Sequence, residues 1–139
     1  MNIALVWLHV SGNLVWIGAI LAVGLVLLGS RGEPQTRGAI ASDIYRRLAV
    51  PAFVVSFVCG AIRLVGTGDA AYYLQQHHWM HPKLTLALVV IALHHVIGAR
   101  TRKMAAGTVQ DAGPAGILTA VLAVAAIGAA FFAIFKIPG

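Results

Sequence analysis

Acidic residues are scarce in this chain, which has four Asp and Glu against ten Lys and Arg in 139 residues. Charged residues of either sign make up 10% of the chain, whereas an ordinary soluble domain carries roughly 25%. The few carboxylates lie in or near expected loops, which argues against paired-carboxylate catalysis and against hard-cation sites in the apolar segments. No phosphate-binding glycine loop, nucleophile elbow or strand-like alternation is present.

Cysteine is almost absent as well. Cys59 is alone, so the chain forms no intramolecular disulfide and offers no cysteine cluster for zinc. We expect Cys59 to be a small packing residue.

Apolar residues are what the chain has in excess, at 60% of the sequence with a mean hydropathy of +0.88. Four stretches are apolar and long enough to cross a bilayer. We therefore predict an all-α integral membrane protein, a four-helix bundle forming a single domain over residues 1–139. The expected spans are residues 3–28, 46–65, 82–100 and 115–135.

The formal charge of +6 does not indicate a nucleic-acid-binding protein, because the basic residues cluster around the first and third expected loops. Those residues are Arg31, Arg37, Arg46, Arg47, Arg100, Arg102 and Lys103. This distribution follows the positive-inside rule, so these loops should face the cytoplasm. Both termini and the loop Gly66–His81 are then expected on the outer, periplasmic side.

The first connection is expected to be long. Gly29–Ser42 has no apolar periodicity and is interpreted as a loop, and Asp43 can cap or begin the second helix. Tyr45 and the two arginines after it suit the headgroup level as interfacial anchors. Pro51 is expected to kink the second span or mark its true start.

The first span carries a polar stripe of His9, Asn13 and Trp16 at positions i, i+4 and i+7, with Gly12 beside it. Polar and small residues on one face of a membrane helix belong against other helices. His9 is therefore expected to point inward near the outer end. A structural histidine that bonds to a neighbouring helix is the alternative.

The third span holds the densest group of ionisable residues. Pro82 suits the first helical turn, and Lys83 and His94 share one stripe while His95 points elsewhere. Ionisable residues within a membrane segment are costly and therefore indicate a site. In the second span, Arg63 shares a face with Cys59 and can either extend to the outer surface or hold a carboxylate.

These residues favour a b-type haem. Four-helix bundles hold haem through inward histidines, and cationic groups at the membrane edge pair with propionates. His9 is the expected iron ligand, with Arg63 and Lys83 as propionate partners. His81 and His94 are alternative second ligands, although His94 lies about 16 Å further along its helix than Lys83. Lys83 is also the candidate for proton transfer.

Copper is the alternative metal, since imidazole and thioether ligands suit it. The outer loop supplies His77, His78, Met80 and His81 within five residues. The last span has small residues at four-residue spacing, such as Ala125 with Ala129, and its surface is expected to pack against another helix within the bundle or across a homodimer.

Three blocks of the sequence carry a resemblance to a known family: WLHVSGNLVWIG, RRLAVPAFV and WMHPKLTLALVVIALHHVIGARTRK. Together they resemble the small membrane family that includes the HemJ haem-b-containing protoporphyrinogen IX oxidases and the related CopD-like copper-resistance proteins. The likeness extends to about Lys103. The Leu-Pro-Arg-Leu end and following Tyr-His of the oxidases' first span are absent here, where AILAVGLVLLGS stands instead.

The resemblance implies that His9 and Lys83 are functionally required and that His94 corresponds to the later histidine of the third span. It implies a multi-pass protein of the bacterial inner membrane that binds porphyrin or haem, with oxidation of protoporphyrinogen IX and a quinone as possible electron acceptor. Because CopD-like proteins share the plan, haem and copper both stay open at this point.

Overall fold

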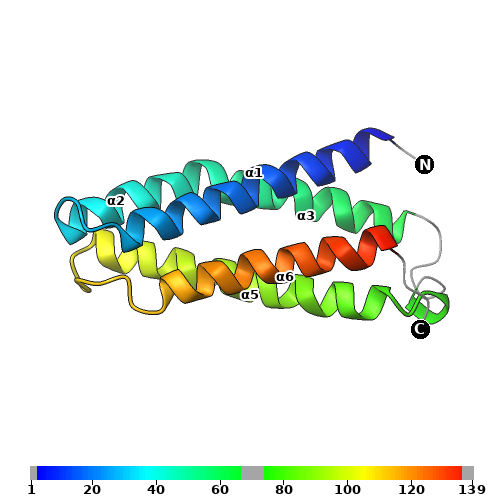
Figure 1. Ribbon diagram of the computed structural model, residues 1–139. Helices are drawn as coiled ribbons and strands as arrows, with labels where there is room; N and C mark the ends of the chain where they lie inside the picture. The colour runs from blue at the N-terminus through cyan, green and yellow to red at the C-terminus, as the bar shows by residue number, and fades with distance from the viewer. Residues whose placement is uncertain (1–2, 67–73, 136–139) are drawn as a thin grey trace.

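The computed structural model describes residues 3–66 and 74–135. It is 86% helical, has no strand in its described part, and contains four helices long and apolar enough to cross a membrane. Figure 1 shows them lying along one common direction. The helical elements are α1 (Ile3–Leu28), α2 (Pro34–Ile44), η1 (Tyr45–Ala49), α3 (Val50–Val65), α5 (Met80–Ala105) and α6 (Ala115–Phe135). The prediction of an all-α four-helix membrane bundle is confirmed.

The second span begins earlier than its composition suggests. The helix starts at Pro34 and continues through η1 to Val65, so the predicted loop over Gly29–Ser42 is wrong and the real connection covers residues 29–33. Pro34 occupies the first turn, where its missing N–H leaves no hydrogen bond unmade. The polar segment that follows is helical because it packs on α5 and α1, and tertiary packing overrides weak local preference.

Pro51 neither starts nor breaks this helix. A proline ring inside an α-helix clashes with the carbonyl four residues earlier. The turn just before Pro51 is wound wider as η1, a π-helix in which the Val50 N–H donates to the Tyr45 carbonyl. Such an inserted π-turn is a known way to accommodate a local conflict within a continuous helix.

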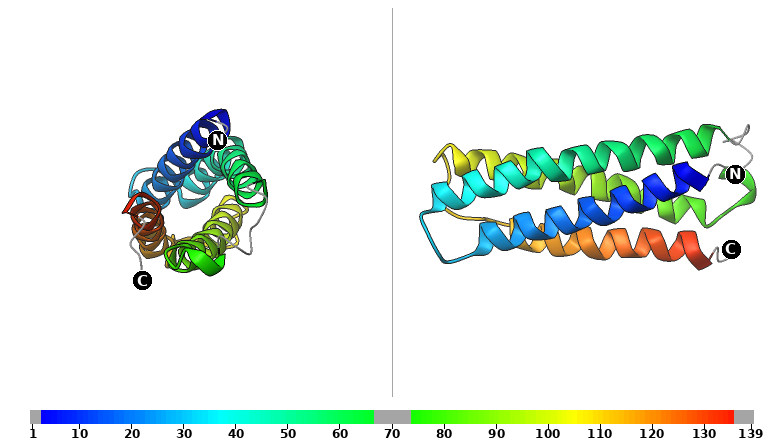
Figure 2. Two further views of the ribbon diagram at one scale, coloured as in Figure 1. Left: turned by 90° about the vertical axis from the view of Figure 1, so that its right-hand side faces the viewer. Right: turned by 90° about the horizontal axis from the view of Figure 1, so that it is seen from above.

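The helices surround a common axis, as the end-on view in Figure 2 shows. α1 packs on α3 and α6, and α5 packs on α6 and α2. The second span contacts α5 at only one end of the bundle. There α2 packs closely against α5, whereas at the other end α3 packs along α1 rather than α5. The bundle is therefore tightest at the end that contains α2.

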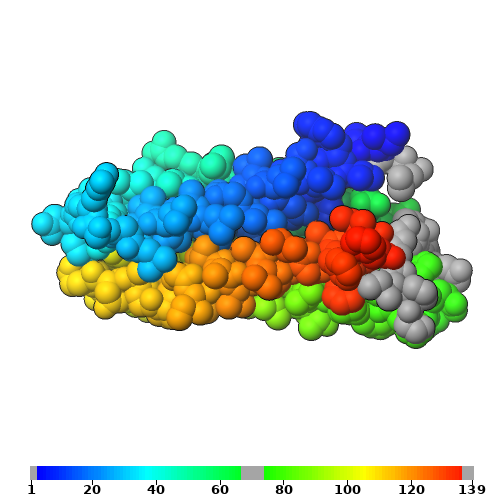
Figure 3. Space-filling model, viewed as in Figure 1, coloured from blue at the N-terminus to red at the C-terminus, as the bar shows by residue number. Residues whose placement is uncertain are grey.

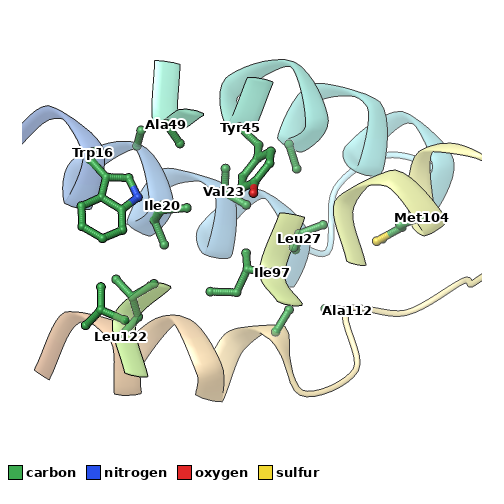
Figure 4. Packing of buried hydrophobic residues seen from close by; sticks show 14 of the residues in the cluster. Trp16, Ile20, Val23, Leu27, Tyr45, Ala49, Ile97, Met104, Ala112 and Leu122 are labelled. Carbon is green, nitrogen blue, oxygen red and sulfur yellow. The ribbon is translucent and has the colours of Figure 1, made fainter. Parts of the chain in front are cut away.

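The core follows the two stripes visible in the sequence. On α1 the polar stripe continues into Trp16, Ile20, Val23 and Leu27, which are all buried. Figure 4 shows these side chains directed toward Ile97 and Leu122 of the opposite helices. On α5 the stripe of Lys83 continues through four further buried residues, which are Val90, His94, Ile97 and Thr101.

The outer surface is apolar where the core is partly polar. Leu14, Leu25 and Ile117 are 70%, 73% and 73% exposed. Several polar side chains are buried, among them Ser56, His94, Thr101 and Thr119. Figure 3 shows the face on which α1 and α6 lie side by side along the length of the bundle. This inverted arrangement suits a protein whose solvent is lipid.

Five basic residues gather at one end of the bundle, namely Arg31, Arg37, Arg100, Arg102 and Lys103, whereas Arg63 and Lys83 lie toward the other end. The connections over residues 29–33 and 106–114 both lie at the basic end, opposite the end where α1 begins and α6 finishes (Figure 1). α1 is 26 residues long, or about 39 Å at 1.5 Å per residue, which exceeds a hydrocarbon core of about 30 Å. The expected assignment of the basic end to the cytoplasm stays a prediction.

Candidate functional site

His9 of α1 packs against α3 in the half of the bundle away from the basic end. Its Nδ1 is 2.7 Å from the Ser56 carbonyl oxygen, and because a carbonyl only accepts, Nδ1 carries the proton and donates. The Ser56 hydroxyl in turn donates to the His9 carbonyl over 3.1 Å. A Cβ on Gly60 would lie 2.9 Å from His9 Cε1, so this close approach of ring and helix depends on glycine.

The other nitrogen of this ring is only weakly engaged. Asn13 Nδ2 lies 3.3 Å from His9 Nε2, which is a long hydrogen bond. The neutral ring therefore keeps its proton on Nδ1 and presents the Nε2 lone pair toward Asn13. An imidazole held by Nδ1–H on a backbone carbonyl is the usual orientation of a metal-ligating histidine.

Two cations stand beside His9. Lys83 of α5 and Arg63 of α3 are both half-buried and near enough to His9 for their charges to act on it. The Lys83 ammonium lies 5.6 Å from the centre of the Trp79 ring, an arrangement typical of a cation–π contact. The structure thus brings together His9, Asn13, Arg63 and Lys83, four of the residues singled out from the sequence.

His94 occupies a different site. It is 1% exposed and lies between the rings of Tyr45 and Phe53, with centroids 4.7 Å and 4.9 Å away. Trp16 Nε1–H donates to His94 Nδ1 over 3.0 Å. Trp16, expected to join a cofactor site with His9, is instead a wall of this aromatic cage.

His9 and His94 hold opposite tautomers. His94 Nδ1 accepts a hydrogen bond, so in the neutral ring the proton sits on Nε2 and no free lone pair is left for a metal. His9 has the reverse arrangement, with Nδ1 donating. His94 would have to give up the bond to Trp16 and exchange its tautomer to ligate iron through Nε2.

The two histidines also lie at different depths. His94 is level with Trp16, and Trp16 is seven residues along α1 from His9, about 10 Å at 1.5 Å per residue. The structure therefore does not bring His9 and His94 together. His81 is exposed, and its Nε2 lies 2.8 Å from the Leu74 carbonyl at the end of the bundle. The geometry favours neither as a partner to His9 on one iron.

The four residues considered for copper are divided between surface and interior. His78 and His81 are exposed with ring centroids 6.4 Å apart, whereas Met80 is buried. Within residues 3–66 and 74–135, no three side chains of His, Cys, Asp or Glu gather closely enough to hold a metal among themselves.

Three site residues were not expected from the sequence. Tyr45, interpreted as an interfacial anchor, is 4% exposed because its ring end fits against Gly98 of α5. Phe53 forms the other wall of the His94 cage. Ser56 lies three residues before Cys59 and seven before Arg63 in the sequence, and this shared helical face is the signal that could have indicated its contact with His9. Cys59 is buried, as expected for a packing residue.

Comparison with known proteins adds no relative: no family model matches the chain, and no curated protein or solved structure matches it either.

Proposed function

We propose that this chain is a haem-b-binding membrane protein, with His9 as its iron ligand. The observation that carries the proposal is the orientation of His9, whose Nδ1–H is held by the Ser56 carbonyl while Nε2 faces a long contact to Asn13. The ring is thus prepared to act as a nitrogen ligand at the cost of one weak hydrogen bond.

The surroundings of His9 fit a porphyrin in two respects. Arg63 and Lys83 place two positive charges near the ring, which suits a cofactor with two propionates. The flanking helices α3 and α5 are neighbours that pack less closely than the other adjacent pairs, so a planar guest between them displaces the fewest helix contacts. Since His81 and His94 are engaged elsewhere, His9 serves as the single protein ligand.

Haem would supply one-electron redox chemistry to this membrane site. The resemblance to HemJ-like proteins supports a porphyrinogen as substrate, with each pair of hydrogens removed reducing one quinone to quinol. Lys83 is then the residue that accepts substrate protons, as a half-buried amine whose charge acts on His9, and Arg63 orients the substrate carboxylates. The same resemblance supports a place in the bacterial inner membrane.

The visible spectrum of the purified protein tests the proposal. Protein produced in a haem-sufficient bacterial host and purified in mild detergent should show a Soret band, and titration of hemin into haem-free protein should saturate at one equivalent. His9→Ala should abolish the band. A colourless protein that gains no Soret band with hemin would refute haem binding.

His78→Ala is the matched control, because it removes an exposed histidine outside the His9 site. It should leave the Soret band unchanged. Elemental analysis of the same samples separates iron from copper: copper bound at one equivalent, lost in His78→Ala and retained in His9→Ala, would replace this proposal with the CopD-like function.

A further inference from the structure

A hollow at the basic end of the bundle has no role in the haem proposal. It has a volume of about 400 Å³ and lies where α1 ends and α2 begins. Its lining combines two arginines with two aliphatic side chains and the short connecting loop, and consists of Val26, Gly29, Ser30, Arg31, Arg37 and Ile40.

The two arginines of this hollow lack an acidic partner within the described part of the chain. Farther along the second span Arg47 pairs with Asp43 at 3.8 Å, and at the basic end Arg100 pairs with Asp111. Arg31 and Arg37 form no such pair among residues 3–66 and 74–135. Two guanidinium groups therefore line one cavity without a close ion pair, although the carboxylate of Glu33 stands in the same connection.

Arg37 also has an unmet hydrogen bond. Its Nε is buried and finds no acceptor among the described residues. A buried donor without an acceptor is costly to keep, and the cost is higher for a charged group. An anion held in the hollow would balance the positive charges of Arg31 and Arg37.

The apolar walls and the position of the hollow decide which anion fits. Ile40 is 50% exposed, and Leu25 and Leu28 beside Val26 on α1 are 73% and 58% exposed. The hollow thus opens at the border between the lipid-facing surface and the basic end. A phospholipid can place its phosphate on the arginines and its acyl chain along Val26 and Ile40, whereas a free anion makes no use of the apolar wall.

We propose that this hollow binds the head group of an anionic phospholipid from the leaflet at the basic end of the bundle. The guanidinium groups of Arg31 and Arg37 hold the phosphate diester, and Val26 and Ile40 contact the first part of an acyl chain. The site is independent of haem, since it lies at the opposite end of α1 from His9.

Native mass spectrometry of protein released from nanodiscs tests this site. Nanodiscs of equal phosphatidylglycerol and phosphatidylcholine should yield protein that retains phosphatidylglycerol selectively. Each arginine near an anionic head group contributes a factor of about five to binding, so Arg31→Gln should reduce retention about 5-fold and R31Q/R37Q about 25-fold. Arg46→Gln removes an exposed charge outside this lining and should change retention less than 2-fold.

Two results would overturn the proposal. Equal retention of phosphatidylglycerol by wild type and Arg31→Gln would do so, and because Arg31 is exposed this variant tests the site even if Arg37 is needed for folding. The second is a rise in melting temperature with inorganic phosphate equal to that with phosphatidylglycerol in detergent, which would identify a free-anion site. Neither result bears on the Soret band.

Discussion

The bundle contains two histidine sites, at the buried His94 and the half-buried His9, that use the same side chain in opposite ways. His94 is surrounded by three aromatic rings, and its Nδ1 is committed to Trp16. His9 is half-buried, donates through Nδ1 to a backbone carbonyl, and has only a long contact at Nε2. The first arrangement commits the acceptor nitrogen of the ring to a contact between helices, whereas the second leaves one nitrogen for a ligand.

Helix packing and nearby charge also differ between the two sites. Around His94 three aromatic rings close in from α1, η1 and α3, namely Trp16, Tyr45 and Phe53. Around His9, α1 and α3 pack closely but α3 and α5 pack loosely against each other, and the charges of Arg63 and Lys83 act on the ring. Tight packing with neutral aromatic partners favours stability, while looser packing with charges favours recognition of an acidic guest.

Among the substitutions proposed here, replacement of His94 should cause the largest loss of stability. His94→Ala removes a fully buried ring between Tyr45 and Phe53 and leaves the Trp16 N–H without its acceptor, so we expect a loss of about 2–4 kcal/mol in the free energy of unfolding. Reversible denaturation in mixed micelles measures it. Hemin binding per folded molecule should stay unchanged.

His95→Ala is the neighbouring control, because His95 is exposed and touches only the edge of the cage, with its ring 6.3 Å from that of Phe53, and we expect a change within about 0.5 kcal/mol. If His94→Ala unfolds no more easily than His95→Ala, or if it loses the Soret band while folded, the division of roles between the two histidines is wrong.

Two glycines allow the His94 and His9 sites to be compared directly, because one glycine packs against a ring of each site. A Cβ on Gly98 would overlap the Tyr45 ring, and a Cβ on Gly60 would lie 2.9 Å from His9 Cε1. Gly98→Ala should therefore destabilise the fold by about 1–3 kcal/mol. Gly60→Ala should act mainly on hemin, weakening its affinity about 10-fold, a change of about 1.4 kcal/mol.

Melting temperature and hemin titration of both glycine variants separate the two effects. The expected pattern is a lower melting temperature for Gly98→Ala at nearly normal affinity, and weaker affinity for Gly60→Ala with a smaller change in melting temperature. The reversed pattern would contradict the assignment of the ligand site to His9.

How far the sequence predicts these sites depends on how local each determinant is. His9, Asn13 and Trp16 recur at the helical period, so their common inward face follows from α1 alone, and it is confirmed. The partner of each one is not local. Trp16 meets His94, which is 78 residues away, and this contact separates Trp16 from the site that its spacing suggested.

The burial of Tyr45 also depends on a partner that is distant in the sequence. Beside two arginines it has the pattern of an interfacial anchor, yet it is buried because Gly98, in another helix, leaves room for its ring. The helical state of Pro34–Ile44 was likewise missed, since a polar segment without apolar periodicity gains its helix from packing on α5 and α1. Spans and faces were predictable, and inter-helix partners were not.

Lys83 provides a test of charge in the looser site. Lys83→Met keeps the length of the side chain and removes the ammonium, so hemin affinity should fall about 10-fold if one charge-assisted hydrogen bond to a propionate is lost. Hemin dimethyl ester lacks the propionate charges and should bind wild type and variant alike. Lys103→Met, at the basic end, is the matched control and should bind hemin normally.

The smallest effect is expected at Ser56. Ser56→Ala removes a hydroxyl that donates to the His9 carbonyl but retains the backbone carbonyl that accepts from His9 Nδ1. Because the ring keeps its main hydrogen bond, the change should be about 0.5–1 kcal/mol in stability and less than about 3-fold in hemin affinity. Loss of the Soret band in this variant would mean that the hydroxyl, whose Oγ also lies 3.2 Å from His9 Nδ1, orients the ligand rather than the backbone carbonyl.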